Sequence, residues 1–504
     1  MNGFVCRNKK GGLLLVLLLS IALSSCFKDG LNEDTRGILG SETFYKTESD
    51  FQAALIPAYR YFSNAFFNAQ GQQTMFGGDD LTTRAGSNKE DFREWDLFDY
   101  NSGSGWIEQF AWQPYWQTIY AANAIINNVD HANADVDAEV LKQIEGQAHF
   151  LRGLSYFMLV REFGGMPLLT EAVATGDEKR ASVLENYQLI ESDMQFAIAN
   201  LPASWSPKGG RATSGAAHTV LASLYLTWAG WPVKDASKYA LAAKEAQTVM
   251  ESGEYGLVDH YIDLWTLDNE LNEEVVFTIV WNLEANTFVN NMSQGYAPIE
   301  EQGWVDGQAE LTLFNRMPPG PRKEATYLTE FVNDLGNGET IDWQDSQLKH
   351  PTFKKWVIGG TPRGAVPHYN GEHNVPLFRY AEVLLTFAEA DAMANGGPGA
   401  ADYDAINAVR QRAGLPDLTP GLGKQAFQDS VVEERAFEFA GEYTRWFDEV
   451  RTESVAKYSG AMRDPDEIPL RNQPSEQYYI SPIPAAELIK DPNLVQNPEG
   501  NVIK

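Results

Sequence analysis

The sequence predicts a mainly α-helical protein in which paired helices alternate with long loop-rich insertions and a few short strands. Residues 211–252 carry apolar side chains at helical spacing on both sides of a Gly-Trp-Pro break at 230–232, which is typical of a helical hairpin. Residues 67–106 and 281–370 are rich in Gly, Pro, Asn, Asp and Trp and lack helical periodicity. We therefore expect a helical scaffold that carries two long insertions.

The hairpin at 211–252 is the clearest local pattern. Thr213 or Ser214 supplies an N-cap for its first helix, and the second helix begins near Asp235. Small alanines of the second helix face larger side chains of the first, and this arrangement loosely resembles a tetratricopeptide-type pair. The residues expected on one face of the first helix are Ala217, Val220, Leu221, Leu224, Tyr225 and Trp228.

Further helices are expected through the rest of the chain, most of them in adjacent pairs. One strand is predicted at Glu274 to Trp281, just before the second insertion. The pairs are scattered rather than tandem, which favours a scaffold interrupted by insertions over a regular repeat array. The expected helical stretches are 48–66, 107–129, 137–163, 184–200, 376–395, 402–413 and 425–451.

The start of the chain has the layout of an export signal. Basic residues within the first ten positions precede an apolar run of eleven residues, and a spanning helix needs roughly 20. The run ends in Leu23-Ser24-Ser25-Cys26, which resembles the lipobox of bacterial lipoproteins. The alternative is an ordinary secretory signal. We expect a signal peptide at 1–25, a lipid-anchored leash at 26–36 and a single domain at 37–504, divided into 37–252, 253–375 and 376–504.

Cys26 is the expected lipid attachment site, and its neighbours bear on location. The other cysteine, Cys6, lies in the removed segment, so no disulfide is possible in the mature chain. Lys28 and Asp29 follow Cys26 and resemble part of the surface-export signal of some Gram-negative lipoproteins. This predicts an outer-membrane lipoprotein that faces outside the cell.

Composition narrows the class of ligand. The formal net charge is -30, with 69 acidic and 39 basic side chains. Nucleic acid is excluded as a partner, because binding phosphates needs clustered Lys and Arg. An acidic surface also repels anions, which favours a neutral ligand. Aromatic residues make up 12%, and we interpret most as core residues and a minority as platforms for sugar rings.

Seven segments, taken in order, carry a resemblance to a known family. The segments are FYKTESDFQAALIPAYRYF (44–62), WQPYWQTIYAANAIINNVD (112–130), AHFLRGLSYFMLVREFGGMPLL (148–169), RATSGAAHTVLASLYL (211–226), PLFRYAEVLLTFAEA (376–390), VVEERAFEFAGEYTRWFDEVR (431–451) and YYISPIPAAELIKDPNLVQNPEG (478–500). Together they resemble the SusD/RagB family of outer-membrane nutrient-binding lipoproteins, and the resemblance covers nearly all of the mature chain.

The resemblance implies a fold with about four tetratricopeptide-like units and an irregular, ligand-bearing part. It implies a partner, a TonB-dependent β-barrel transporter over which such a protein sits as a hinged lid. The ligand delivered would be an oligosaccharide or polysaccharide. Two alternatives stay open: a peptide ligand within the same family, and a helical-repeat scaffold that binds only proteins.

The two insertions are where the resemblance places sugar contacts. An aromatic pair would grip the apolar face of a sugar, while polar side chains would bond its hydroxyl groups. For every one of these residues the alternative is loop packing. The expected ligand-binding residues are Asp80, Arg84, Trp95, Asn101, Tyr296 and Trp304.

Neither a metal nor another cofactor is expected. His368, His373 and Glu372 form the only close histidine group, and the HEXXH pattern is absent. Walker A, G-x-S-x-G and dinucleotide motifs are also absent, so the sequence predicts a binding protein rather than an enzyme.

Residues 434–451 carry a dense set of acidic and basic side chains, and a pair of carboxylates can hydrolyse glycosides. That chemistry requires two carboxyl groups facing each other across a cleft, which residues of one helix rarely do. Glu442 with Arg445, Arg445 with Asp448, and Asp448 with Arg451 are spaced i,i+3. The spacing favours local ion pairs.

Overall fold

The structure is a computed structural model, and it describes residues 44–100, 103–171, 178–281, 290–333, 338–357, 371 and 373–497. The expected signal peptide, leash and lipid site at Cys26 lie outside the described residues. So do Asn101, His368 and Glu372. In the part of the chain that is described, no helix is both long and apolar enough to cross a membrane.

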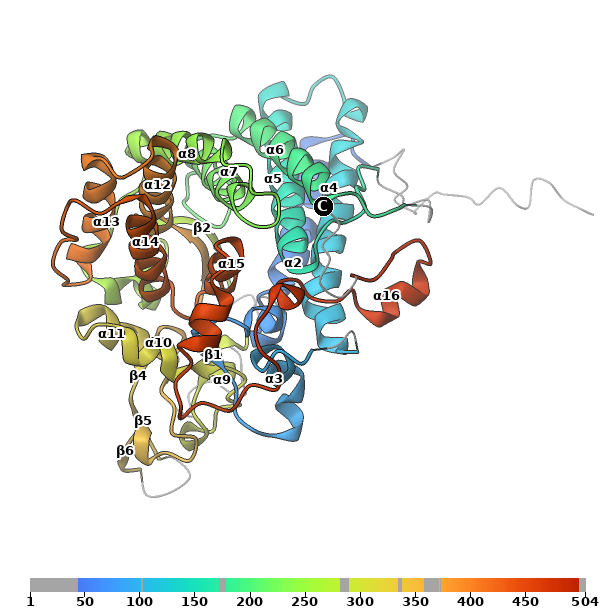
Figure 1. Cartoon of the computed structure of the whole chain (residues 1–504). Coiled ribbons are helices and arrows are strands. Elements are labelled where there is room, and N and C mark those ends of the chain that lie inside the picture. Colours follow the sequence, from blue (N-terminus) through green and yellow to red (C-terminus); the bar gives the residue numbers. More distant parts are fainter. Residues whose placement is uncertain are drawn as a thin grey trace, which may run out of the picture.

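The fold is mainly helical, as predicted, and its helices pack in pairs. The pairs α2/α4, α5/α6, α7/α8 and α12/α13 are joined in a row, because α4 packs on α5, α6 on α7 and α8 on α12. Figure 1 shows these helices above the irregular part that carries α9 to α11 and β4 to β6. The paired helices are α2 (Glu48–Asn64), α4 (Gln113–Ile126), α5 (Ala138–Phe163), α6 (Val183–Asn200), α7 (Ser214–Ala229), α8 (Lys238–Ser252), α12 (Tyr380–Asn395) and α13 (Ala400–Arg412).

The remaining elements are short, apart from α14. The other helices are α3 (Glu90–Asp96), α9 (Met292–Tyr296), α10 (Leu311–Arg316), α11 (Pro321–Thr326), α14 (Lys424–Glu438), α15 (Arg445–Arg451) and α16 (Ala485–Lys490). The strands are β1 (Leu81–Thr82), β2 (Val275–Ile279), β3 (Gln308–Ala309), β4 (Tyr327–Leu328), β5 (Glu330–Val332), β6 (Thr340–Asp342), β7 (Thr352–Phe353) and β8 (Val375–Arg379). They form two-stranded antiparallel pairs, β1 with β3, β2 with β8, β4 with β7 and β5 with β6.

The predicted hairpin is confirmed. Thr213 is the N-cap of α7, and its side-chain oxygen accepts a hydrogen bond from the Ala216 N–H at 3.1 Å. α7 ends at Gly230, where a Cβ atom would lie 2.4 Å from the carbonyl oxygen of Arg451. The Trp231 N–H donates to that same carbonyl. The break between the two helices is therefore also a close contact with the C-terminal part of the chain.

Two predicted helices are partly wrong. The stretch at 425–451 is interrupted, because Gly441 and Tyr443 have φ values of +74° and +67° that no helix allows. The first residues of the stretch at 376–395 form β8, which pairs with the predicted strand β2. The insertion at 67–106 also holds the short helix α3, which sequence periodicity did not indicate.

The break at Gly441 changes the expected ion pairs. Asp448 and Arg451 do pair, at 2.8 Å. Arg445 instead pairs with Asp79 at 2.6 Å, and Glu442 pairs with Arg379 at 2.8 Å. The ion pairs of Arg445 and Glu442 thus join segments that are far apart in the sequence.

The ion pair of Glu442 with Arg379 continues to Glu438, at the end of α14, because Arg379 pairs with both carboxylates. The Glu438 carboxylate accepts hydrogen bonds from Arg322 at 3.1 Å, Arg379 at 2.9 Å and Arg412 at 2.5 Å. Each arginine comes from a different element, α11, β8 and α13. One carboxylate therefore holds three parts of the C-terminal half together.

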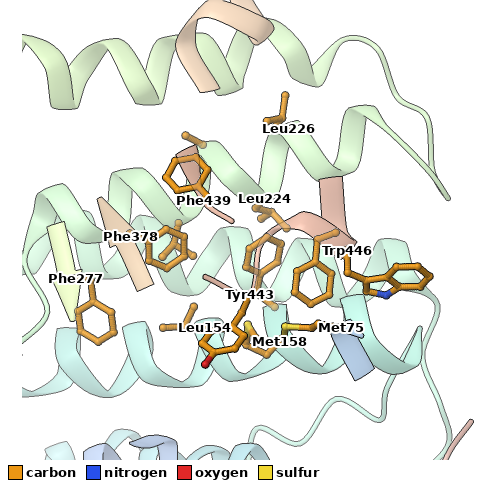
Figure 2. Packing of buried hydrophobic residues seen from close by; sticks show 14 of the residues in the cluster. Met75, Leu154, Met158, Leu224, Leu226, Phe277, Phe378, Phe439, Tyr443 and Trp446 are labelled. Carbon is orange, nitrogen blue, oxygen red and sulfur yellow. The ribbon is translucent and has the colours of Figure 1, made fainter. Parts of the chain in front are cut away.

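The main hydrophobic core lies between the row of paired helices and the C-terminal elements. Figure 2 shows Leu154 and Met158 of α5 and Leu224 and Leu226 of α7 beside side chains of the C-terminal half. The C-terminal half contributes Phe378, Phe439, Tyr443 and Trp446. The core thus joins the N-terminal and C-terminal halves of the described chain.

The N-cap of α5 gives a simple test of local stability. The exposed Asp137 side chain accepts hydrogen bonds from the N–H groups of Glu139 at 2.8 Å and Val140 at 3.1 Å. We expect Asp137→Ala to lower the free energy of unfolding by about 1 kcal/mol, because two N–H groups lose their acceptor. Urea unfolding measures the change. Asp137→Ser, which restores an acceptor, should recover most of the loss, and an equal loss in both variants would contradict a capping role.

Candidate functional site

Two buried carboxylates of the first insertion attach it to the C-terminal part of the chain. Asp79 pairs with Arg445 at 2.6 Å, and one oxygen of Asp80 accepts the Gly441 N–H at 2.8 Å. Burial raises the pKa of Asp80 to about 7. Since Asp80 is only 1% exposed, its expected role as a sugar ligand is corrected to that of an interior anchor.

Trp95 and Tyr296 are also interior residues. The Trp95 ring stacks on Tyr100 with centroids 4.7 Å apart, and its Nε1–H donates to the Ser481 hydroxyl oxygen at 3.0 Å. The Tyr296 ring packs against Phe353 and Trp356. Trp95 is 1% and Tyr296 0% exposed, so neither ring offers a face to a sugar. The expected platforms at these two positions are corrected to packing contacts.

Strand pairing brings the two insertions together. β1 and β3 are antiparallel, with Leu81 opposite Ala309 and Thr82 opposite Gln308. Continuing that register places Arg84 opposite Asp306, where the second insertion approaches β3. We call the surface where residues 83–91 meet residues 294–307 the seam.

A buried ion pair holds the seam. The Lys89 ammonium group pairs with the Asp306 carboxylate, and both side chains are almost fully buried. Burial raises the pKa of Asp306, while the charges of Lys89 and Arg84 oppose that rise. Arg84 thus lies within electrostatic reach of Asp306, as the strand register indicates.

Arg84 and Trp304 are the two predicted residues that keep accessible surface at the seam. Both are half-buried. The Trp304 N–H donates to the Gln294 carbonyl at 2.9 Å, and the Asp306 N–H donates to the Gly295 carbonyl at 2.7 Å, so the loop folds back on α9. The buried Nε atom of Arg84 has no hydrogen-bond partner in the described part of the chain. An indole ring and a guanidinium group are the parts expected of a site for a polar, ring-shaped ligand.

Lys89 and Asp306, which hold the seam together, were not predicted from the sequence. They are 217 positions apart, and neither stands in a local motif. Gly307 was missed too, although a Cβ there would lie 2.4 Å from the Tyr296 ring. Of these three residues only Gly307 could have been noticed in the sequence, because a glycine within a loop-rich insertion can mark a close contact.

Metal-binding side chains do not gather in the described residues. No group of three or more His, Cys, Asp or Glu side chains there is arranged to hold a metal ion. His373, the described member of the predicted histidine group, lies 3.4 Å from the Glu270 carboxylate.

Comparison with known proteins assigns the family. The model described as SusD family matches residues 319–499. A second model, described as starch-binding associating with outer membrane, matches residues 78–226. The chain belongs to the SusD/RagB family. The matched ranges of this SusD-like chain include the segments at 112–130, 148–169 and 376–390, which carried the resemblance in the sequence.

Relatives of similar length support the assignment. SusD-like protein P2 of Formosa agariphila is 26% identical over 98% of this chain and 100% of its own length. A SusD-like protein of Bacteroides ovatus is 25% identical, over 88% of this chain and 82% of its own length.

Solved structures show the same fold. A SusD homolog from Bacteroides thetaiotaomicron superposes with a TM-score of 0.79 at 24% identity, covering 91% of this chain and 98% of its own. A structure described as a laminarin-binding SusD-like protein has a TM-score of 0.73 at 25% identity, covering 90% and 100%. Surface glycan-binding protein A from Bacteroides thetaiotaomicron in complex with laminarihexaose has a TM-score of 0.74 at 20% identity, with coverage of 90% and 100%.

Proposed function

We propose that this protein binds an oligosaccharide or polysaccharide at the cell surface without cleaving it. The observation that carries the proposal is its membership of a family in which similar structures are described as surface glycan-binding proteins. The seam offers a place for the ligand. There, the Trp304 ring would lie against the apolar C–H face of a sugar, and the Arg84 guanidinium would donate to hydroxyl oxygens.

The buried pair beneath the seam would make that site rigid. Because Lys89 and Asp306 are tied together, the segments that carry Arg84 and Trp304 keep a fixed spacing. A site whose groups are already in place loses less conformational entropy on binding.

Replacing Trp304 tests the site. We expect Trp304→Ala to weaken binding of laminarihexaose, or of the best ligand in a glycan panel, by about tenfold or more, equal to about 1.4 kcal/mol. Titration calorimetry on the purified mature protein measures the affinity. Tyr120→Ala is the matched control, since Tyr120 is an aromatic residue of α4 that is 44% exposed. Equal affinities in the two variants would discard the seam as the site.

The same titrations address the remaining alternatives. Binding of peptides but no glycan would replace the proposed ligand class with a peptide. If neither glycans nor peptides bind, and another protein co-purifies, the result would favour a protein-binding scaffold. Chromatography of a glycan after long incubation should show no shorter product, and release of fragments would make the protein an enzyme.

We further propose that Cys26 carries a lipid that holds the protein at the outer membrane beside a TonB-dependent β-barrel transporter, to which it delivers the glycan. The lipobox-like sequence at 23–26 and the family description that mentions the outer membrane support this location. A tether raises the effective concentration of the receptor at its transporter.

Replacing the anchor residue tests the location. We expect Cys26→Ala to move the protein out of the membrane fraction of its own bacterium, because no thiol remains to be acylated. Fractionation followed by immunoblotting measures the distribution, with Cys6→Ala as the control. Retention of Cys26→Ala in the membrane fraction would contradict the anchor. Co-purification of the wild-type protein with a β-barrel transporter tests the partner.

A further inference from the structure

The loop of residues 302–307 has two left-handed backbone positions beside Trp304. The φ angle is +62° at Gln302 and +52° at Val305. Left-handed backbone brings the Cβ atom of an L residue too close to the following carbonyl oxygen, so glycine is common there and a β-branched residue is a genuine outlier. Val305, directly between Trp304 and Asp306, is therefore the exceptional position of this loop.

The glycines of the loop stand where there is no room for a side chain. At Gly303 a Cβ atom would lie 1.8 Å from the Ala297 carbonyl oxygen, and at Gly307 it would lie 2.4 Å from the Tyr296 ring. Both glycines have φ angles outside the left-handed region. The loop thus has glycine where space requires it, and valine where the backbone alone would favour glycine.

The Val305 side chain fills interior space. It is fully buried, with 0% of its surface exposed. A strained backbone conformation persists only where the surrounding structure over-determines it. The buried isopropyl group of Val305 supplies such packing, and a glycine at this position would relax the backbone but leave it free to move.

Hydrogen bonds on both sides of Val305 attach the loop to the end of α9. The Trp304 N–H donates to the Gln294 carbonyl at 2.9 Å, and the Asp306 N–H donates to the Gly295 carbonyl at 2.7 Å. In an extended chain the N–H groups of residues 304 and 306 would lie about 6.6 Å apart, whereas successive residues of a helix rise by only about 1.5 Å. The left-handed turn at Val305 shortens the chain, so that both N–H groups reach neighbouring carbonyls.

The same turn separates a surface side chain from an interior one. Trp304, before the turn, is half-buried and keeps accessible surface at the seam. Asp306, after the turn, is 1% exposed, and its carboxylate pairs with the buried Lys89. Because the Asp306 side chain is fixed, the backbone at Val305 sets the direction in which the Trp304 ring leaves the loop.

We propose that Val305 is a positioning residue, whose buried side chain holds the left-handed turn that keeps the Trp304 ring at the surface of the seam. The inference rests on the proposed function, because Trp304 is the side chain expected to contact the sugar. Val305 has no exposed surface for a ligand and acts through Trp304. A ring that is already in place loses less conformational entropy when the ligand binds.

Fluorine NMR of protein labelled with 5-fluorotryptophan follows the Trp304 ring without a ligand. Trp304→Phe identifies the Trp304 signal among those of the 13 tryptophans. We expect Val305→Gly to shift or broaden this signal, and Val305→Thr, which keeps the branched Cβ, to retain it. Lys234→Gly is the matched control, because Lys234 also has a left-handed φ, of +59°, but lies in the break between α7 and α8. That variant should keep the Trp304 signal of the wild type.

Titration calorimetry then tests the consequence for binding. We expect Val305→Gly to bind laminarihexaose, or the best ligand of the glycan panel, about five- to tenfold more weakly than the wild type. Val305→Thr should recover most of this loss, and Lys234→Gly should bind as tightly as the wild type. If Val305→Gly does not fold, Val305→Ala, which also lacks the two methyl groups, takes its place in both measurements.

Failure of the proposed function and failure of this inference give different results. If the wild type binds no glycan, or if Trp304→Ala leaves its affinity unchanged, the glycan site at the seam is wrong, and the fluorine spectra alone decide whether Val305 positions Trp304. An unchanged Trp304 signal in Val305→Gly would overturn the inference. So would a shifted signal with unchanged affinity for a glycan whose binding depends on Trp304.

Discussion

Replacing Glu438 by glutamine is expected to lower the free energy of unfolding by about 3 to 5 kcal/mol. Burial by itself would raise the pKa of Glu438, but the guanidinium groups of Arg412, Arg379 and Arg322 lower it to about 2. Glutamine has the same shape and no charge. Three buried guanidinium groups would then lose the carboxylate that they share, which is the costly way to break a buried ion pair.

Urea unfolding of the purified mature protein measures this loss. Glu453→Gln is the matched control, because Glu453 pairs with Lys234 at 2.7 Å while both side chains stay about half exposed. An exposed pair is worth about 0 to 1 kcal/mol. Losses of similar size in the two variants would show that the network around Glu438 does not stabilise the fold.

Stability should also fall as the pH rises toward 8, because of Glu162. Burial raises the pKa of this group from 4.5 to about 8, so the folded protein holds a proton that the unfolded chain releases between those values. The unfolded state therefore binds fewer protons, and the free energy of unfolding decreases as the pH rises through this window. The contribution is present in full below about pH 4.5 and is lost above about pH 8, at up to about 1.4 kcal/mol per pH unit.

Glu162→Gln isolates that contribution. We expect the variant to lose less stability than the wild type between pH 5 and 8, with a difference of a few kcal/mol over the range. Unfolding curves at several pH values give the two slopes. Glu185→Gln, which alters an exposed capping residue of α6, is the control and should keep the wild-type slope in this window. Parallel curves for wild type and Glu162→Gln would contradict a buried, protonated Glu162.

The helices could be predicted because their signals are local. The hairpin at 211–252, its cap at Thr213 and the strand before the second insertion follow from spacing within a few residues. The break in the helix predicted at 425–451 could not be predicted in this way. It depends on contacts with distant segments, because Gly441 lies against Phe353 and its N–H donates a hydrogen bond to the Asp80 carboxylate. A glycine within a helical pattern is tolerated too often to indicate such a contact.

The site was predicted less well than the fold. Sequence reasoning found both insertions, but it could not separate Trp304, which keeps accessible surface, from Trp95, which is buried. The difference lies in Ser481 and Tyr100, which pack against Trp95. The pairing of β1 with β3, which brings the two insertions together, joins strands of only two residues and leaves no periodic pattern in the sequence.

The contacts beneath the first insertion have a consequence for the order in which the protein folds. Asp79 is held by Arg445, 366 positions later, and Trp95 by Ser481, 386 positions later. Contacts so distant in sequence form late, because the intervening chain must close first. The N-terminal part of the chain can form its early helices by itself, but it cannot complete the contacts beneath the seam. The seam is thus complete only once the C-terminal residues are in place.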